Sequence, residues 1–244
     1  MDATERFTGR ASDYVGGRPS YPPGVIDALF NGLRDPRSLI AVDLGAGTGI
    51  SSRFLAASCA KVIAIEPNAE MREHAAQVAN VEWVAGTAEA TTLEPGISDL
   101  VVAFQAFHWF KHEAALREMK RIVRPGGRAA LVYNERDDAD LFTAEYSKIA
   151  RKFATDQTEQ RRDNGRGVFE AYPGWRTITV VNLPNAQTLG RDRLHARANS
   201  TSYFPKSGPN ARELHASIDR IFDEYQRNEE VTMHMKTIVL IGDF

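Results

Sequence analysis

The sequence of 244 residues has little cysteine and little net charge. Cys59 is the only cysteine, which excludes an intrachain disulfide and a cysteine-ligated metal cluster, so we expect no metal site and interpret Cys59 as a small core residue. The formal net charge is -2 at pH 7, because 30 basic residues are matched by 32 acidic ones. A nucleic-acid backbone requires a cationic surface, so nucleic acid is not an expected partner.

Long apolar runs are also missing. No run approaches the roughly 18 residues of a membrane span, and Asp2, Glu5 and Arg6 interrupt any signal-peptide core. We therefore expect a cytoplasmic protein without a membrane partner. The length and a hydrophobic content of 43% suffice for one α/β domain, and internal repeats are absent. The sequence indicates no oligomeric state.

The most informative stretch runs from Leu39 to Pro67. Leu39 to Leu44 is short and almost continuously apolar, which fits a parallel strand buried on both faces. Three alternating glycines follow between Gly45 and Gly49, where side chains would block a tight turn and the approach of a ligand to the backbone. A helix and a second strand ending in Glu66 complete the predicted unit. The stretch therefore predicts a cofactor site at the glycine turn.

Two cofactor families use such a turn. The dinucleotide fingerprint G-x-G-x-x-G/A requires a third small residue at the position of Ile50, and this sequence has G-x-G-x-G instead. Asp43, two residues before the turn, would repel a pyrophosphate but could receive a cationic ligand or order the turn through backbone N–H groups. Glu66 could accept hydrogen bonds from ribose hydroxyls in either family. The pattern favours S-adenosylmethionine, with an NAD-dependent oxidoreductase or a non-catalytic nucleotide-binding module as alternatives.

Three motifs carry a resemblance to a known family. D-L-G-A-G-T-G at 43–49 and S-D-L-V-V-A-F-Q-A-F-H-W-F at 98–110 resemble the class I S-adenosylmethionine-dependent methyltransferases. With R-I-V-R-P-G-G-R-A-A-L at 121–131, the sequence is similar to the branch that includes trans-aconitate methyltransferases and related small-molecule enzymes. The resemblance covers roughly residues 10–134 and implies S-adenosyl-L-methionine as cofactor, S-adenosyl-L-homocysteine as product and a small organic methyl acceptor.

The expected fold is α/β, a Rossmann-like, seven-stranded, mostly parallel sheet with helices on both faces and a helical lid insertion. Periodicity predicts helices at 69–79, 111–123, 191–200 and 211–225 and strands at 81–85, 99–104, 128–133, 176–183 and 231–241. Residues 1–244 are expected to form a single methyltransferase domain.

The residues expected to bind the cofactor are Asp43, Gly45, Ala46, Gly47, Glu66, Pro67, Met71, Ala88, Glu89 and Gln105. Met71 could cover the adenine face or belong to the core. Many family members have an acid where Thr87 stands, so the backbone of Ala88 or the carboxylate of Glu89 is expected to replace it.

The resemblance implies that residues 1–34 fold over the pocket as a cap. The Arg18 guanidinium suits a carboxylate of the cofactor or the substrate, although Arg18 could simply be solvated. His108 is the candidate catalytic base, because it follows a predicted central strand and histidine titrates near neutral pH, although it could simply hold its loop. The residues expected to contact the acceptor are Tyr14, Arg18, Tyr21, His108, Trp109, Tyr133 and Tyr146.

The resemblance implies that residues 135–173, an amphipathic insertion, form a lid over the substrate within the domain. Phe142, Tyr146, Ile149 and Phe153 recur at helical spacing, and such an insertion would decide substrate specificity. The basic run at 160–166 could bind an anionic substrate or be a solvated turn.

The aromatic residues of these segments predict a largely apolar pocket for an acceptor with one polar handle. We leave three acceptor atoms open, namely a carboxylate oxygen, a hydroxyl oxygen or an acidic carbon. A carboxylate is already ionised at neutral pH and needs no base, whereas the other two would require one.

Overall fold

The computed structural model describes residues 18–244, apart from the side chain of Glu159, and contains one seven-stranded sheet in the order β3-β2-β1-β4-β5-β7-β6. The strands are β1 (Ile40–Leu44), β2 (Lys61–Ile65), β3 (Val81–Val84), β4 (Ser98–Phe104), β5 (Val123–Arg136), β6 (Thr177–Gly190) and β7 (Glu230–Asp243). β1 to β5 pair in parallel, whereas β7 is antiparallel to both β5 and β6. The predicted Rossmann-like, mostly parallel sheet is therefore confirmed.

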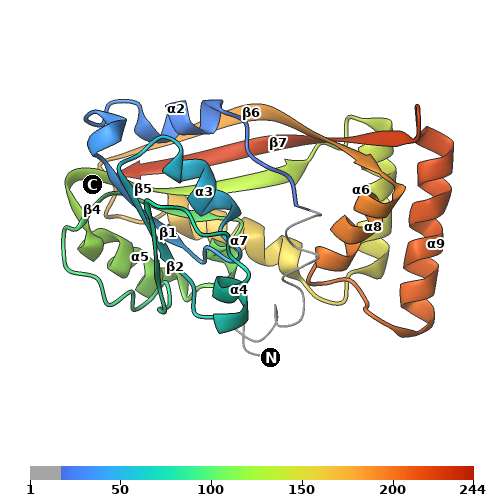
Figure 1. Ribbon diagram of the computed structural model, residues 1–244, viewed down its shortest axis with the longest axis horizontal. Coiled ribbons are helices and arrows are strands. Elements are labelled where there is room, and N and C mark those ends of the chain that lie inside the picture. Colours follow the sequence, from blue (N-terminus) through green and yellow to red (C-terminus); the bar gives the residue numbers. More distant parts are fainter. Residues whose placement is uncertain (1–17) are drawn as a thin grey trace.

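Helices cover both faces of this sheet (Figure 1). They are α2 (Gly24–Phe30), α3 (Ile50–Ala56), α4 (Ala69–Glu73), α5 (His112–Ile122), α6 (Leu141–Phe153), α7 (Thr158–Glu170), α8 (Arg191–Ser200) and α9 (Gly208–Tyr225), with the 3₁₀ turns η1 (Pro36–Ser38) and η2 (Phe107–Trp109). α2 and α3 pack on one face of the sheet, and α5 and α7 contribute to the core on the other. Within residues 18–244, a helix with the length and apolarity of a membrane span is not found.

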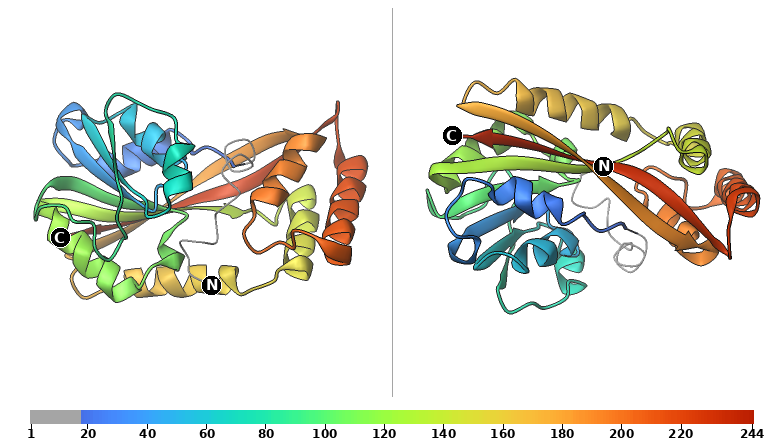
Figure 2. Two further views of the ribbon diagram at one scale, coloured as in Figure 1. Left: turned by 60° about the horizontal axis from the view of Figure 1, so that its bottom comes forward. Right: turned by 90° about the horizontal axis from the view of Figure 1, so that it is seen from above.

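A second hydrophobic core lies at the far end of the long strands. β5, β6 and β7 have 14 residues each and extend beyond the four shorter strands, and α6, α8 and α9 pack on this extension (Figure 2). Phe142, Ile149 and Phe153 of α6 are buried there against Leu194 of α8 and Ile218 of α9. The predicted apolar stripe of the lid therefore serves mainly to fix α6 to this extension.

One predicted helix is shorter than expected. The pattern predicted a helix from Ala69 to Ala79, but α4 ends at Glu73. Asn80 donates hydrogen bonds from its side-chain amide to the carbonyls of Ala56 and Cys59, at 2.8 and 3.1 Å, and so holds the chain where it enters β3. Tertiary contacts of this kind routinely override helix propensity.

A buried carboxylate on α5 gives the fold a pH-dependent contribution. Glu118 accepts hydrogen bonds from the Arg121 guanidinium at 2.7 Å and from the Thr91 backbone N–H at 2.9 Å. Arg121 and Thr91 lower the pKa of Glu118 to about 2, although burial acts in the opposite direction. Because the folded pKa lies below the unfolded value, this stability is present above pH 4.5 and is lost as the pH falls toward 2.

We expect Glu118→Gln to lower the free energy of unfolding by about 2 kcal/mol at pH 7 and by less at pH 3, as measured by denaturant titration. Glu113 on the same helix is the matched control, because its side chain is 88% exposed and its ion pair with Arg117 is 3.8 Å long. Glu113→Gln should change stability by less than about 0.5 kcal/mol. Equal losses for Glu118→Gln at both pH values would contradict the assigned pKa.

Candidate functional site

The loop from β1 to α3 forms the predicted glycine turn. Gly45 and Gly47 both have positive φ, of 68° and 58°. A Cβ atom on Gly45 would lie 2.8 Å from the Cβ of Ala106, so this position has no room for a side chain. A Cβ atom on Gly47 would meet nothing within 4 Å, so the backbone here faces open space. The turn thus leaves a backbone surface that a ligand can approach.

Asp43 lies beneath this turn and is fully buried. Its Oδ2 accepts hydrogen bonds from the hydroxyls of Ser51 and Ser52, at 2.7 and 2.6 Å. Burial raises the pKa of Asp43 to about 6, and the two hydroxyls oppose this change. Asp43 does not belong to the described lining of the cavity, so its direct contact with a cofactor stays a prediction. It orders the start of α3 through serine hydroxyls rather than through the backbone N–H groups that the sequence suggested.

Glu66 lies at the end of β2 and also holds the turn. Its Oε2 accepts a hydrogen bond from the Gly47 N–H and its Oε1 one from the Asn68 N–H, both at 2.9 Å. Burial raises the pKa of Glu66, and these two hydrogen bonds act against the increase. The acid therefore lies beside the open face of the turn, and its position depends on the backbone of the turn itself.

Gln105 follows the last residue of β4 at the same edge of the sheet. Its φ is +54°, which is an uncommon conformation for a residue other than glycine. Its backbone N–H donates to the Val132 carbonyl at 2.9 Å, and its side-chain amide donates to the Asn134 carbonyl at 3.2 Å. Strained residues of this kind concentrate at functional sites, and Gln105 lines a cavity together with the glycine turn.

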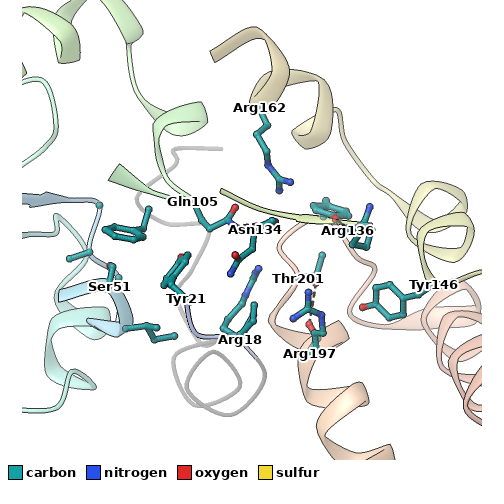
Figure 3. A pocket seen from close by; sticks show the side chains of 17 residues that line it. Arg18, Tyr21, Ser51, Gln105, Asn134, Arg136, Tyr146, Arg162, Arg197 and Thr201 are labelled. Atoms are coloured by element: carbon teal, nitrogen blue, oxygen red, sulfur yellow. Dashed lines mark hydrogen bonds between the residues drawn. The ribbon is translucent and has the colours of Figure 1, made fainter. Parts of the chain in front are cut away.

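A cavity extends from the glycine turn toward the extension of the sheet (Figure 3). The described residues that line it are Arg18, Pro19, Tyr21, Gly45, Ala46, Gly47, Ile50, Ser51, Phe104, Gln105, Asn134, Arg136, Tyr146, Arg162, Arg197, Thr201 and Tyr203. Four of the predicted cofactor residues belong to this lining, namely Gly45, Ala46, Gly47 and Gln105.

The other predicted cofactor residues lie outside this lining. Met71 and Ala88 are buried, and Pro67 is partly buried. The Glu89 carboxylate accepts a hydrogen bond from the Lys111 N–H at 2.7 Å, so it is tied to the start of α5. A role of these residues toward adenosine remains a prediction.

Four arginines from four different segments point into the cavity (Figure 3). Arg18 precedes α2 and donates to the Ser200 carbonyl at 2.9 Å. Arg136, at the end of β5, donates to the Ser147 hydroxyl at 2.8 Å. Arg162 comes from α7, and Arg197 comes from α8. The described part of the lining contains no aspartate and no glutamate, so it is strongly cationic.

The arginines influence one another and their surroundings. Arg197 donates to the Gln187 side-chain oxygen at 2.5 Å, and burial lowers its pKa to about 10, with the charges of Arg18 and Arg136 acting in the same direction. Arg162 lies with its guanidinium carbon 5.9 Å from the centre of the Tyr133 ring. Positive potential therefore accumulates in this part of the cavity.

The predicted acceptor residues divide into two groups. Arg18, Tyr21 and Tyr146 line the cavity, whereas His108, Trp109 and Tyr133 do not belong to the described lining. Tyr14 lies outside the described residues.

His108 is buried behind the cavity wall. Only 7% of the residue is exposed, and its ring centre lies 4.6 Å from that of Trp109 and 6.3 Å from that of Tyr133. Burial holds the pKa of His108 well below its ordinary value, and the nearby charges of Arg162 and Arg161 add to this effect. The ring is therefore neutral at neutral pH, and its Nδ1 has no hydrogen-bond partner in the described part of the chain.

The prediction of a largely apolar pocket was wrong. Phe107 packs in the core against Phe169, and Phe142 and Phe153 belong to the second core, so these aromatic side chains are used for packing. The cavity residues that were not predicted from the sequence include Asn134, Arg136, Arg197, Thr201 and Tyr203. The basic run at 160–166 did contain a signal for Arg162, and it forms part of α7 rather than a solvated turn.

Comparisons with known proteins identify the family. A family model described as a methyltransferase domain matches residues 42–131. The chain is 32% identical over 243 residues to an uncharacterised methyltransferase-like protein of Schizosaccharomyces pombe, with 97% of this chain and 94% of that protein covered. It is 38% identical over 150 residues to an uncharacterised methyltransferase of Mycobacterium tuberculosis, which covers 61% of this chain and 60% of that protein.

Solved structures show the same fold. A protein named as a type II methyltransferase from Anaeromyxobacter dehalogenans superimposes with a TM-score of 0.64 at 22% identity, covering 93% of this chain and 97% of that one. A methyltransferase named for an antibiotic biosynthesis pathway of Anabaena variabilis gives a TM-score of 0.61 at 21% identity, covering 88% and 96%.

Proposed function

Because the chain belongs to the class I S-adenosylmethionine-dependent methyltransferases, we propose that it methylates a carboxylate oxygen of a small organic acid. The observation that supports an acid is the lining of the cavity, where four arginines stand opposite the glycine turn. Arginine is well suited to carboxylates because its planar guanidinium can donate two parallel hydrogen bonds. The resemblance to trans-aconitate methyltransferases remains a prediction and agrees with such an acceptor.

The choice of oxygen follows from the absence of a base in the described lining. This lining contains no aspartate, glutamate, histidine, lysine or cysteine, and burial raises the pKa of its Tyr146. A carboxylate needs no base: its oxygen forms a bond to the methyl carbon while the carbon–sulfur bond breaks, and the electron pair stays on sulfur. No proton is transferred, so the task of the protein is to align the acceptor with the methyl group.

The site around the glycine turn fits the cofactor. Gly47 faces open space, and the Glu66 carboxylate lies beside it with lone pairs available to ribose hydroxyls. Arg18 would suit the methionine carboxylate of the cofactor or a carboxylate of the acceptor. Gln105, directly after β4, lines the same cavity. When bound, the cofactor supplies an activated methyl group on a sulfonium. We further propose that α6 and α7, within residues 135–173, form the acceptor side of the site.

The test of this function has a binding step and a turnover step. Calorimetry with S-adenosylmethionine and S-adenosylhomocysteine should give sub-millimolar dissociation constants for both, as expected for an enzyme of this class. A methyl-transfer screen over small mono-, di- and tricarboxylic acids, phenols and heterocycles should then give turnover with acids only. Turnover restricted to phenols or heterocycles would contradict the proposed acceptor, and binding of neither cofactor form would contradict the function.

A third experiment asks whether His108 acts as a base. For a carboxylate acceptor, we expect His108→Ala to reduce kcat by less than about tenfold, because only packing against Trp109 and Tyr133 is lost. The kcat profile of the unmodified enzyme should show no acidic limb near pH 6.5, because the pKa of His108 lies well below that value. A loss of roughly 100-fold together with the disappearance of an acidic limb would identify His108 as a base and exclude a carboxylate acceptor.

A further inference from the structure

The cavity brings the cofactor turn and the arginines into one space. Gly45, Gly47 and Gln105 line it together with the four arginines, and Figure 3 shows Arg162 pointing toward Gln105 and Asn134 from α7. S-adenosylmethionine carries a sulfonium cation at its reacting centre, whereas S-adenosylhomocysteine carries a neutral thioether there. Because the acceptor must reach the methyl group, the sulfonium has to face the same cavity as the arginines.

We propose that the arginine cluster couples the two binding sites electrostatically: it disfavours the cationic cofactor until an anionic acceptor neutralises the cavity. This inference rests on the proposed function, but it concerns affinity and not turnover. Like charges in a partly buried cavity repel, so the arginines weaken the binding of the sulfonium. A carboxylate bound among the arginines attracts the sulfonium and offsets part of that repulsion. By linkage, S-adenosylmethionine would strengthen acceptor binding by the same factor.

Other groups in this region already respond to the arginines. Arg18 and Arg162 both help to lower the pKa of the buried His108, and Arg18 and Arg136 act in the same direction on Arg197. The positive potential of the cluster therefore extends beyond the side chains themselves. At about 10 Å and an effective dielectric constant of about 20, one unit charge changes the affinity for a cation by roughly tenfold.

A change in the charge of the arginine cluster should alter the affinity for S-adenosylmethionine more than the affinity for S-adenosylhomocysteine. After the acceptor is converted into a methyl ester and the sulfonium into a thioether, the reacting centre has lost one positive and one negative charge. The arginines then neither attract the methylated acceptor as an anion nor repel the cofactor product as a cation.

Arg162 offers the sharpest test because it lies on α7 and is only partly buried, so its replacement should leave the fold intact. The dissociation constants of S-adenosylmethionine and S-adenosylhomocysteine are measured by calorimetry for the unmodified protein, Arg162→Gln, Arg162→Lys and Arg162→Glu. The last variant places a carboxylate in the cavity in place of the acceptor's charge. Arg193→Gln is the control, because Arg193 is exposed on α8 and does not line the cavity.

For each variant we compare the dissociation constant of S-adenosylmethionine divided by the dissociation constant of S-adenosylhomocysteine. We expect this ratio to fall by roughly three- to tenfold in Arg162→Gln and further in Arg162→Glu, and to stay unchanged in Arg162→Lys and Arg193→Gln. Arg136→Gln provides a second charge removal from β5, and thermal unfolding confirms that each variant is folded.

The outcomes separate this inference from the proposed function. If neither cofactor form binds the unmodified protein, the proposed function fails. If both bind but the ratio is the same in Arg162→Gln, Arg162→Glu and Arg162→Lys, the electrostatic coupling is refuted and the methyltransferase assignment stands. A ratio that falls equally in Arg162→Lys would show that the shape of the side chain matters and not its charge, which also refutes the coupling.

Discussion

Replacing Glu66 with alanine is expected to weaken the binding of both S-adenosylmethionine and S-adenosylhomocysteine by roughly 10- to 100-fold. The carboxylate accepts hydrogen bonds from the backbone N–H groups of Gly47 and Asn68, both at 2.9 Å, and is buried. Its removal leaves two backbone donors without their partner and removes the acceptor for the ribose hydroxyls, a loss of about 1.5 to 3 kcal/mol. Calorimetric titration of the purified variant measures this directly.

The matched control for this variant is Glu82→Ala. Glu82 lies on the neighbouring strand β3 and pairs with Lys61 across the surface, with 54% of its side chain exposed. Its removal deletes the same charge without touching the turn, so cofactor affinity should stay within about twofold of that of the unmodified protein. A folded Glu66→Ala protein that binds the cofactor normally would remove Glu66 from the site.

The second large effect is expected at Arg197. We predict that Arg197→Gln raises the KM for the acid acceptor by roughly 30-fold or more, because the loss of a buried, charge-assisted contact costs about 2 to 5 kcal/mol. The guanidinium is oriented by Gln187 and lies 3.7 Å from the Met235 sulfur, so it is presented to the cavity in a fixed position. The effect should fall on KM more than on kcat, because the contact holds the acceptor before and during methyl transfer.

Arg193→Gln on the same helix is the control for this experiment as well, since its side chain is exposed and outside the cavity lining. Cofactor binding by Arg197→Gln should be retained, which distinguishes loss of the acceptor contact from general damage to the protein. Unchanged KM for every acid that the enzyme methylates would exclude Arg197 from the acceptor site.

The sequence alone determined the strands and the glycine turn of the predicted cofactor site. The unit from Leu39 to Pro67 is local in sequence: a buried strand, a glycine turn and a strand ending in an acid are each specified by neighbouring residues. The positive φ angles of Gly45 and Gly47 follow from the turn that only glycine forms without strain. The fold class was predictable for the same reason, because hydrophobic periodicity records which face of each element is buried.

Only the tertiary structure decided the acceptor half. The sequence pointed to Arg18 and to the basic run around Arg162, but Arg136 and Arg197 each resemble an ordinary surface arginine, and the four are far apart in sequence. They converge because the long strand β5 and the helix α8 bring Arg136 and Arg197 to the cavity, where they meet Arg162 of α7 and Arg18 of the segment before α2. The aromatic residues that suggested an apolar pocket satisfy the same hydrophobic pattern whether they face a ligand or a second core. A sequence pattern indicates that a side chain is buried, but it does not indicate which residues the side chain contacts. The positive charge of this cavity is therefore apparent only in the folded chain.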